Sequence, residues 1–205
     1  MKLFKKNNYP KHLVEEDLTF FQQALIFIWE VFKVVIISLI IIIPVRYFLI
    51  KPFYVKGASM EPSFYNNEYL IIDEISYRFN EPKRGDTIVF HYPLDRSQYF
   101  IKRVIGLPGE KIQITAGQIY IFNEHNPEGR VLDETYLTPG MRTIGEFDVR
   151  LLDDEYYLLG DNRSASLDSR VFGQVKRDVI VGRTWIRGWP LSRISIVLTD
   201  FEYNL

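Results

Sequence analysis

The sequence predicts a mainly β domain that is preceded by one N-terminal transmembrane helix. Two observations carry this prediction. One long apolar segment lies near the N-terminus of the 205-residue chain, and short runs rich in β-branched and aromatic residues follow it. Glycine, proline, asparagine and aspartate separate these runs, as is typical of strands joined by turns. The length suffices for a membrane anchor and one folded domain with a small insertion.

The apolar segment is long enough to cross a bilayer. Residues 34–45 (VVIISLIIIIPV) carry no charge, and the apolar character extends over about residues 31–50. A helix rises about 1.5 Å per residue, so about 20 residues span the ~30 Å hydrocarbon core of a membrane. We therefore expect a transmembrane signal anchor over residues 24–50, after an N-terminal segment over residues 1–23.

Two other readings of this segment are a buried core helix and a cleaved secretory signal. An Ile-rich run flanked by aromatic residues is rare in soluble cores. The segment is also longer than the apolar region of a secretory signal, and no small-x-small cleavage pattern follows it. An uncleaved signal anchor fits these features best.

The charges beside the anchor favour one orientation. More basic residues lie on its N-terminal side than on its far side: Lys2, Lys5, Lys6, Lys11 and Lys33 against Arg46, Lys51 and Lys56. Because basic residues stay preferentially on the inner side, the N-terminus is expected to be cytoplasmic. The difference is small, and long domains cross largely regardless of charge. We expect a single-pass plasma-membrane protein whose residues 51–205 form an extracytoplasmic, β-rich domain.

Seven runs after the anchor predict strands. They are Glu68–Ile75, Asp86–Tyr92, Tyr99–Ile105, Lys111–Thr115, Gln118–Phe122, Tyr156–Leu159 and Val179–Ile186. Ala116-Gly117, between two alternating runs, predicts a tight hairpin turn. The polar segment Asn123–Arg150 contains Asn-Pro and Pro-Gly pairs and predicts a loop or a small excursion from the main sheet. A small excursion from the main sheet is therefore expected over about residues 111–150.

The composition excludes several classes of function. The formal net charge is -1, so no global basic field indicates a nucleic-acid partner. The chain has no cysteine, which excludes disulfides, thiolate nucleophiles and cysteine-based metal sites. His12, His91 and His125 are the three histidines, and they do not have the spacing of metal ligands. A metalloprotease is not indicated.

Ser59 is a candidate nucleophile. It lies nine residues after Ile50, within Ser59-Met60-Glu61-Pro62-Ser63. Gly57 and Pro62 bracket it, as expected for a serine on a rigid turn whose backbone amides approach a substrate carbonyl. The string lacks the closing glycine of a G-x-S-x-G elbow, so it does not indicate an α/β-hydrolase. Taken alone, it is more readily explained as a serine in a turn after a membrane helix.

Lys102 is a candidate base. It lies in the apolar run Tyr99–Ile105, where period-two alternation puts it on one face with Phe100 and Val104. A lysine on an apolar face is open to desolvation, which lowers its pKa and frees its amine to accept a proton. The alternative is a lysine that extends to solvent at a strand edge beside Arg103.

A third string, Gly160–Arg170 (GDNRSASLDSR), is dense in small polar and charged residues. It is either a solvated loop or a support for a site. A serine hydroxyl in such a loop can orient a lysine by a hydrogen bond, and an Asp–Arg pair can fix the loop. Asn162-Arg163-Ser164 is a formal glycosylation triplet, but such triplets are frequent by chance.

Four strings in order behind one anchor resemble the bacterial type I signal peptidases, the membrane-bound Ser/Lys endopeptidases that remove signal peptides from exported proteins. The strings are Ser59–Ser63, Gly85–Phe90 (GDTIVF), Lys102–Glu110 (KRVIGLPGE) and Gly160–Arg170. Each string is weak evidence alone, and the ordered set is specific. The resemblance covers the anchor and most of the domain.

The resemblance implies roles for individual residues. Ser59 becomes the nucleophile and Lys102 the general base. Ser166 becomes the hydroxyl that orients the lysine, and Asp168 and Arg170 become a structural ion pair. The resemblance also implies an antiparallel-sheet catalytic domain over residues 51–205, no cofactor, and signal peptides and the lipid bilayer as partners.

Substrate recognition follows from the same resemblance. Small residues at substrate positions P1 and P3 are expected to fit shallow apolar pockets lined by Val55, Met60, Phe64, Phe100 and Ile101. Some relatives carry a serine two positions before the nucleophile, whose hydroxyl helps to form the oxyanion hole. This chain has Gly57 there, so the second oxyanion donor is in question, and the Gly57 amide region or a water is a candidate.

Two functions from other classes remain as alternatives. One is a non-enzymatic, membrane-tethered β module that binds export substrates without cutting them. The other is a soluble, self-cleaving regulator of the repressor type, which shares Ser/Lys chemistry. That regulator requires a DNA-binding domain before the serine, where this chain has a membrane-length apolar run.

Overall fold

The computed structural model describes residues 19–44, 51–197 and 203. Residues 1–44 and 45–205 form two separate units. The expected N-terminal segment 1–23 lies mostly outside the described residues, and so do residues 45–50 of the expected anchor.

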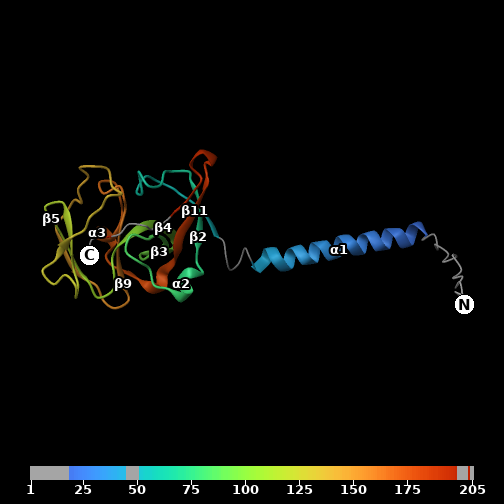
Figure 1. Cartoon of the computed structure of the whole chain (residues 1–205), viewed down its shortest axis with the longest axis horizontal. Coiled ribbons are helices and arrows are strands. Elements are labelled where there is room, and N and C mark those ends of the chain that lie inside the picture. Colours follow the sequence, from blue (N-terminus) through green and yellow to red (C-terminus); the bar gives the residue numbers. More distant parts are fainter. Residues whose placement is uncertain (1–18, 45–50, 198–202, 204–205) are drawn as a thin grey trace, which may run out of the picture. The chain divides into compact units, whose positions relative to one another are not determined.

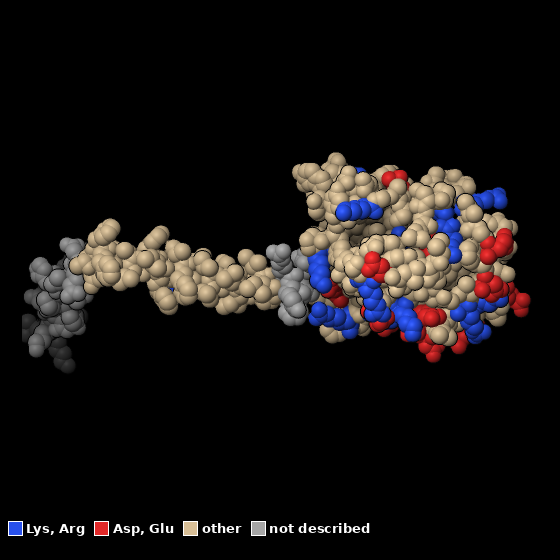
Figure 2. All heavy atoms as spheres, turned by 180° about the vertical axis from the view of Figure 1, so that it is seen from behind, with Lys and Arg blue, Asp and Glu red and all other residues tan. Residues whose placement is uncertain are grey.

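The first unit contains α1 (Phe20–Pro44), which begins four residues before the expected start of the anchor. Thr19 and Gln22 start the helix as a reciprocal cap: the Thr19 N–H donates to Gln22 Oε1 (2.9 Å), and the Gln22 N–H donates to Thr19 Oγ1 (3.4 Å). None of its side chains is buried in the protein, and their surface is almost free of charge (Figure 2). The helix is long and apolar enough to cross a membrane.

The second unit is built on an eight-stranded antiparallel sheet in the order β1-β2-β11-β3-β4-β9-β10, with β12 paired to β11. Its strands are β1 (Lys51–Tyr54), β2 (Tyr69–Asp73), β3 (Thr87–Tyr92), β4 (Asp95–Gly106), β9 (Glu155–Leu159), β10 (Val175–Lys176), β11 (Ile180–Trp189) and β12 (Ser195–Ile196). Short helices lie between them: α2 (Ser76–Phe79), α3 (Ser169–Phe172), η2 (Arg177–Val179) and η3 (Leu191–Arg193).

A second, four-stranded sheet has the order β7-β6-β5-β8. Its strands are β5 (Lys111–Thr115), β6 (Gln118–Phe122), β7 (Arg130–Val131) and β8 (Phe147–Arg150). The β5–β6 hairpin turns at Ala116 and Gly117, which both have positive φ, as the tight-turn prediction requires. This sheet lies at one end of the unit, with β2 and β11 at the other end and β3 and β4 between (Figure 1).

The prediction of a mainly antiparallel β domain is confirmed, and all seven predicted runs contain strands. The reading of Asn123–Arg150 as a loop is wrong for β7 and β8, which pair with β6 and β5. These two additions are too short for alternation to be recognised in the sequence. They complete the second sheet, whose strands span residues 111–150, the range of the expected excursion from the main sheet.

Three buried clusters hold this unit together. One joins β3, β4 and β9 with α3, and a second joins β4 and β9 to the small sheet through Ile105, Leu159 and the four isoleucines of β5 and β6. The third underlies the loop after β1 and contains Val55, Met60 and Phe64. Burial of these apolar side chains is the main stabilising term of the fold.

Strand β4 divides its side chains between these clusters. Phe100 and Val104 pack in the first cluster, whereas Ile105 belongs to the second and Ile101 packs against the third. The Lys102 amine lies 5.4 Å from the centroid of the Phe100 ring. The period-two prediction for this strand is therefore confirmed, and Lys102 lies on its apolar face.

Candidate active site

Ser59 is positioned by the loop between β1 and β2. Its side chain is half-buried, and the next residue, Met60, is buried in the cluster beneath the loop. Gly57 has φ +91°, a backbone conformation that favours glycine. Its N–H donates to Asn66 Oδ1 at 2.9 Å. The loop is thus held on both sides of the serine.

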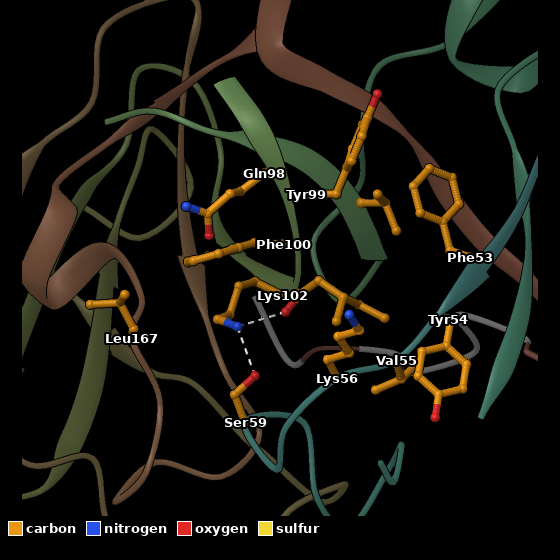
Figure 3. Close-up of a pocket in the computed structure, with 12 residues that line it drawn as sticks. Phe53, Tyr54, Val55, Lys56, Ser59, Gln98, Tyr99, Phe100, Lys102 and Leu167 are labelled. Carbon is orange, nitrogen blue, oxygen red and sulfur yellow. Dashed lines mark hydrogen bonds between the residues drawn. The ribbon is translucent and has the colours of Figure 1, made fainter. Parts of the chain in front are cut away.

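Lys102 approaches Ser59 from β4. Its amine nitrogen lies 2.8 Å from Ser59 Oγ and 2.8 Å from the carbonyl oxygen of Ile101 (Figure 3). The lysine is 3% exposed. The structure therefore brings together, at hydrogen-bond distance, two residues that are 43 positions apart in the sequence.

Burial changes the chemistry of this amine. Desolvation lowers the pKa of Lys102 from 10.5 to about 8, while the negative charges of Asp168 and Asp161 act in the opposite direction. Since one pKa unit corresponds to about 1.4 kcal/mol, the charged form is disfavoured by roughly 3 kcal/mol. A substantial fraction of the amine is therefore neutral near pH 8 and able to accept a proton.

The loop after β9 holds the backbone of the serine. The Asn162 N–H donates to the carbonyl oxygen of Ser59 (3.0 Å), and Asn162 Nδ2 donates to that of Ala58 (3.2 Å). Gly160 packs beside the same carbonyl. These contacts couple the third sequence string to the candidate nucleophile.

Asp168 and Arg170 form a buried ion pair within this loop. Arg170 donates through Nε and Nη2 to the two carboxylate oxygens of Asp168, each at 2.8 Å. The carboxylate also accepts the N–H of Gly160 (3.1 Å) and that of Arg170 at the start of α3. The pair therefore fixes both ends of the loop.

Ser166 does not make the hydrogen bond to Lys102 that the sequence led us to expect. Its hydroxyl oxygen is buried and has no partner among the described residues. It packs against Gly160, beside the backbone of Ser59. The two hydrogen bonds of the Lys102 amine go to Ser59 and Ile101 instead.

An open cleft of about 540 Å³ leads to Ser59 and Lys102. Its other lining residues come mainly from β1, β3 and β4: Phe53, Tyr54, Val55, Lys56, Val89, Gln98, Tyr99, Phe100, Ile101 and Leu167. Val55, Phe100 and Ile101, which the resemblance predicts to line the substrate pockets, line this cleft. Away from Ser59, the rings of Phe53 and Tyr99 meet edge to face, with centroids 5.2 Å apart (Figure 3).

Met60 and Phe64 do not line this cleft. Both are almost completely buried in the cluster under the loop, at 1% and 2% exposure. Their side chains support the wall that Val55 presents to the cleft, because all three belong to one cluster. Their placement as lining residues is therefore corrected.

Sequence reasoning missed a buried ion pair behind the lysine. Arg103 donates through Nε and Nη2 to the carboxylate of Asp161 (2.8 and 2.6 Å) and through Nη1 to the carbonyl oxygen of Gly85 (2.8 Å). Both side chains are at most 5% exposed. The sequence offered one indication of this pair: Arg103 directly follows Lys102, and Asp161 lies in the third string beside Asn162.

The described residues contain no group of three or more His, Asp or Glu side chains placed to hold a metal ion. A serine hydroxyl beside a desolvated amine, at the end of an open cleft, is an arrangement suited to nucleophilic catalysis. The fold and this site together define a serine hydrolase.

Comparison with known proteins identifies the family. The profile of the family "Signal peptidase, peptidase S26" matches residues 28–189. Signal peptidase I of Leptolyngbya laminosa is 38% identical over 81% of this chain and 82% of its own length. Signal peptidase IB of Staphylococcus aureus is 31% identical over 82% of this chain and 89% of its own length.

A solved structure of a signal peptidase I from Enterococcus faecalis is 31% identical and covers 51% of this chain and 97% of that one, with a TM-score of 0.43. The chain belongs to the signal peptidase family, peptidase S26. It is a serine endopeptidase of the signal peptidase I type, and its apolar N-terminal helix agrees with a membrane-anchored enzyme.

Proposed function

We propose that this protein removes N-terminal signal peptides from exported preproteins, cutting after small residues at P1 and P3, with Ser59 as nucleophile and Lys102 as general base. The observation that carries the proposal is the 2.8 Å contact between the buried Lys102 amine and Ser59 Oγ. A serine hydroxyl is a weak nucleophile unless a base removes its proton, and a desolvated lysine is such a base.

The reaction follows from this geometry. The neutral Lys102 amine accepts the Ser59 hydroxyl proton as the oxygen attacks the scissile carbonyl carbon. The resulting ammonium then protonates the amine of the departing mature chain, which leaves an acyl-enzyme on Ser59. Lys102 next deprotonates a water that attacks the ester, and returning the proton to Ser59 restores the enzyme.

The oxyanion needs hydrogen-bond donors. We assign the Ser59 N–H as one donor, because it belongs to the residue that carries the attacking oxygen. The Gly57 N–H already donates to Asn66 Oδ1, so Gly57 supplies a second donor only if that bond is exchanged. The other candidate for the second donor is a water.

The cleft suits an extended peptide. Within the described residues, β1 pairs only with β2, and residues 95–102 of β4 pair only with β3, so both strands present a free edge to the cleft. Four antiparallel pairings connect β1 to β4 in the order β1-β2-β11-β3-β4. Because each pairing reverses the strand direction, β1 and β4 run in the same direction. A substrate strand can therefore hydrogen-bond by its backbone while its side chains enter the apolar pockets.

The remaining assignments concern the membrane. We propose that residues 24–50 anchor the enzyme, with the N-terminus cytoplasmic and residues 51–205 extracytoplasmic. Ser59 is nine residues past the end of that segment. Its partners would be the signal peptides and the lipid bilayer, with no nucleic acid and no cofactor.

The test is cleavage of a radiolabelled preprotein by the purified full-length protein in detergent. Wild type is expected to release the signal peptide, whereas Ser59→Ala and Lys102→Ala are expected to lose at least 1,000-fold in kcat, on the order of other nucleophile–base pairs. Ser195→Ala and Lys176→Ala, both exposed, are matched controls that should retain full activity.

Other outcomes would favour the alternatives. Cleavage at the wild-type rate by Ser59→Ala would refute the nucleophile assignment. Stable binding of the preprotein without cleavage would favour a non-enzymatic module. Recovery of the protein in the soluble fraction after cell breakage would favour a self-cleaving regulator.

A further inference from the structure

Tyr203 packs into the β-rich unit from beyond the residues that the family profile matches. The profile ends at residue 189, and Tyr203 is the only residue after Val197 that the structure describes. Its partly buried ring packs against the cluster that joins β4 and β9 to the small sheet. It also lies over Gly85, where a Cβ would come within 2.8 Å of the ring and its hydroxyl.

Four charged groups influence the Tyr203 phenol, and two of them form the ion pair behind the lysine. Arg103 on β4, Asp161 after β9, Glu134 before β8 and Arg84 before β3 all act on its phenol. Burial is the largest influence and raises the pKa of Tyr203 to about 12, so the phenol is neutral at physiological pH. Tyr203 is thus an uncharged group beside a buried ion pair.

The Arg103–Asp161 pair connects the two halves of the site. Arg103 follows Lys102 on β4, and its Nη1 donates to the carbonyl oxygen of Gly85, the residue covered by Tyr203. Asp161 precedes Asn162, whose N–H donates to the Ser59 carbonyl oxygen. A continuous set of contacts therefore runs from Tyr203 to both candidate catalytic residues.

We propose that Tyr203 is a positioning residue for the peptidase site: its ring excludes water from the buried Arg103–Asp161 ion pair, which sets the strand of Lys102 against the loop that holds Ser59. This inference rests on the proposed function. The attraction within an ion pair strengthens as the local dielectric falls, and a buried pair remains tight only while its surroundings stay dry and its hydrogen bonds are satisfied.

The shielding group is the aromatic ring, so the conservative variant is expected to rescue the defect. In preprotein cleavage, Tyr203→Ala should lower kcat by about tenfold or more with KM within about twofold of wild type, because small displacements of catalytic groups are costly. Tyr203→Phe should remain within about twofold of wild type in both parameters. Tyr203→Leu replaces the alanine variant if the latter does not fold.

Phe147→Ala is the matched control. The ring that lies over the Arg103 guanidinium, at 4.1 Å, is that of Tyr136, whereas Phe147 packs partly buried against the same cluster as Tyr203. It should lower the thermal midpoint as Tyr203→Ala does, yet leave kcat near the wild-type value. Equal losses of kcat in the two alanine variants, or failure of Tyr203→Phe to restore activity, would overturn the proposal.

A second readout does not depend on peptide cleavage. Hydrogen exchange of the backbone amides of residues 102–104 and 161–163 should accelerate in Tyr203→Ala and not in Phe147→Ala. If wild type cleaves no preprotein, the proposed function fails, and hydrogen exchange still decides whether Tyr203 protects the pair. Unchanged exchange in Tyr203→Ala would overturn the inference even if the enzyme is active.

Discussion

Gly160 lies directly against the backbone carbonyl of Ser59: a Cβ on Gly160 would stand 2.4 Å from that oxygen and 2.1 Å from Ser166 Oγ. The φ angle of Gly160 is not in the left-handed region, so the requirement for glycine here is steric. The absence of a side chain lets the loop after β9 approach the serine closely enough for Asn162 to donate to it.

Gly160→Ala is therefore expected to displace Ser59 from Lys102. Overpacking at a buried backbone contact costs about 1–3 kcal/mol of stability, and misalignment of the pair should lower kcat about 100-fold. Preprotein cleavage and thermal unfolding in detergent measure the two effects. Gly188→Ala is the control, since its Cβ would find its nearest atom at 3.8 Å. Wild-type cleavage by Gly160→Ala would show that the close approach does not position the serine.

The pH dependence of cleavage should report the lysine. The neutral amine is the reactive form, and the pKa of Lys102 is lowered to about 8 by desolvation. In the free enzyme kcat/KM should therefore rise with pH along an acidic limb centred near pH 8 and level off above it. Initial rates between pH 6 and 10, at substrate concentrations well below KM, give this profile. A limb centred above pH 10 would mean that the amine keeps the pKa of an exposed lysine.

The same desolvation should make Lys102 destabilising at neutral pH. The pKa of Lys102 is about 8 in the folded protein, whereas its ordinary value is 10.5. Between pH 8 and 10.5 the unfolded chain therefore binds more protons than the folded protein. The free energy of unfolding therefore rises with pH in this window, and the full penalty is present below pH 8. Lys102→Met should raise the free energy of unfolding by roughly 2–3 kcal/mol at pH 7.

This gain should shrink as the pH rises from 8 to 10.5. Lys176→Met is the control, because Lys176 is exposed and its substitution should change stability little at any pH. Thermal unfolding followed by circular dichroism across this range measures both variants. A Lys102→Met variant that is less stable than wild type at pH 7 would contradict the desolvation of the lysine.

Alternation made the strands predictable, and it also identified the face of β4 that carries Lys102. A lysine between Phe100 and Val104 at period two has to share their apolar surroundings. The small strands β7 and β8 could not be read in the same way, because two to four residues give too little periodicity. Their pairing with β6 and β5 is decided by tertiary contact.

The loops around the site were predicted less well, because no period fixes the direction of a side chain there. Met60 and Phe64 follow the nucleophile closely, yet the loop turns both into the core. The family resemblance implies a contact between Ser166 and Lys102, but the Ser166 hydroxyl packs against Gly160. Arg103 and Asp161 are 58 positions apart, so only the fold brings this pair together.

Ser166→Ala separates a structural role from an orienting role. The Ser166 hydroxyl is buried and has no partner among the described residues, so Ser166→Ala should leave the free energy of unfolding unchanged or raise it by up to about 1–3 kcal/mol. If Ser166 orients Lys102 during the reaction, kcat should still fall by about tenfold or more. Full activity in Ser166→Ala would remove it from the site. Ser195→Ala, exposed on β12, is the control.

The residues at the wall of the cleft and those beneath it should respond differently to substitution. Ile101 lines the cleft beside Lys102, whereas Met60 is buried beneath it, so shortening the two side chains should have different effects. Ile101→Ala enlarges the cleft and should raise the relative kcat/KM for preproteins with valine or leucine at P1 or P3 by roughly 10–200-fold, the range that one methylene-sized difference gives in a pocket.

Met60→Ala instead leaves a cavity under the loop and should cost about 2–5 kcal/mol of stability without admitting larger residues. A set of preproteins that differ only at P1 or P3, cleaved by both variants and by wild type, tests the distinction. Met60→Ala could instead broaden the range of accepted P1 and P3 residues as much as Ile101→Ala does. The buried methionine would then shape the pocket directly, and the distinction between residues that line the cleft and residues that support it would be wrong. If Ile101→Ala leaves the preference unchanged, selection of small residues resides in the cleft walls formed by Val55 and Phe100.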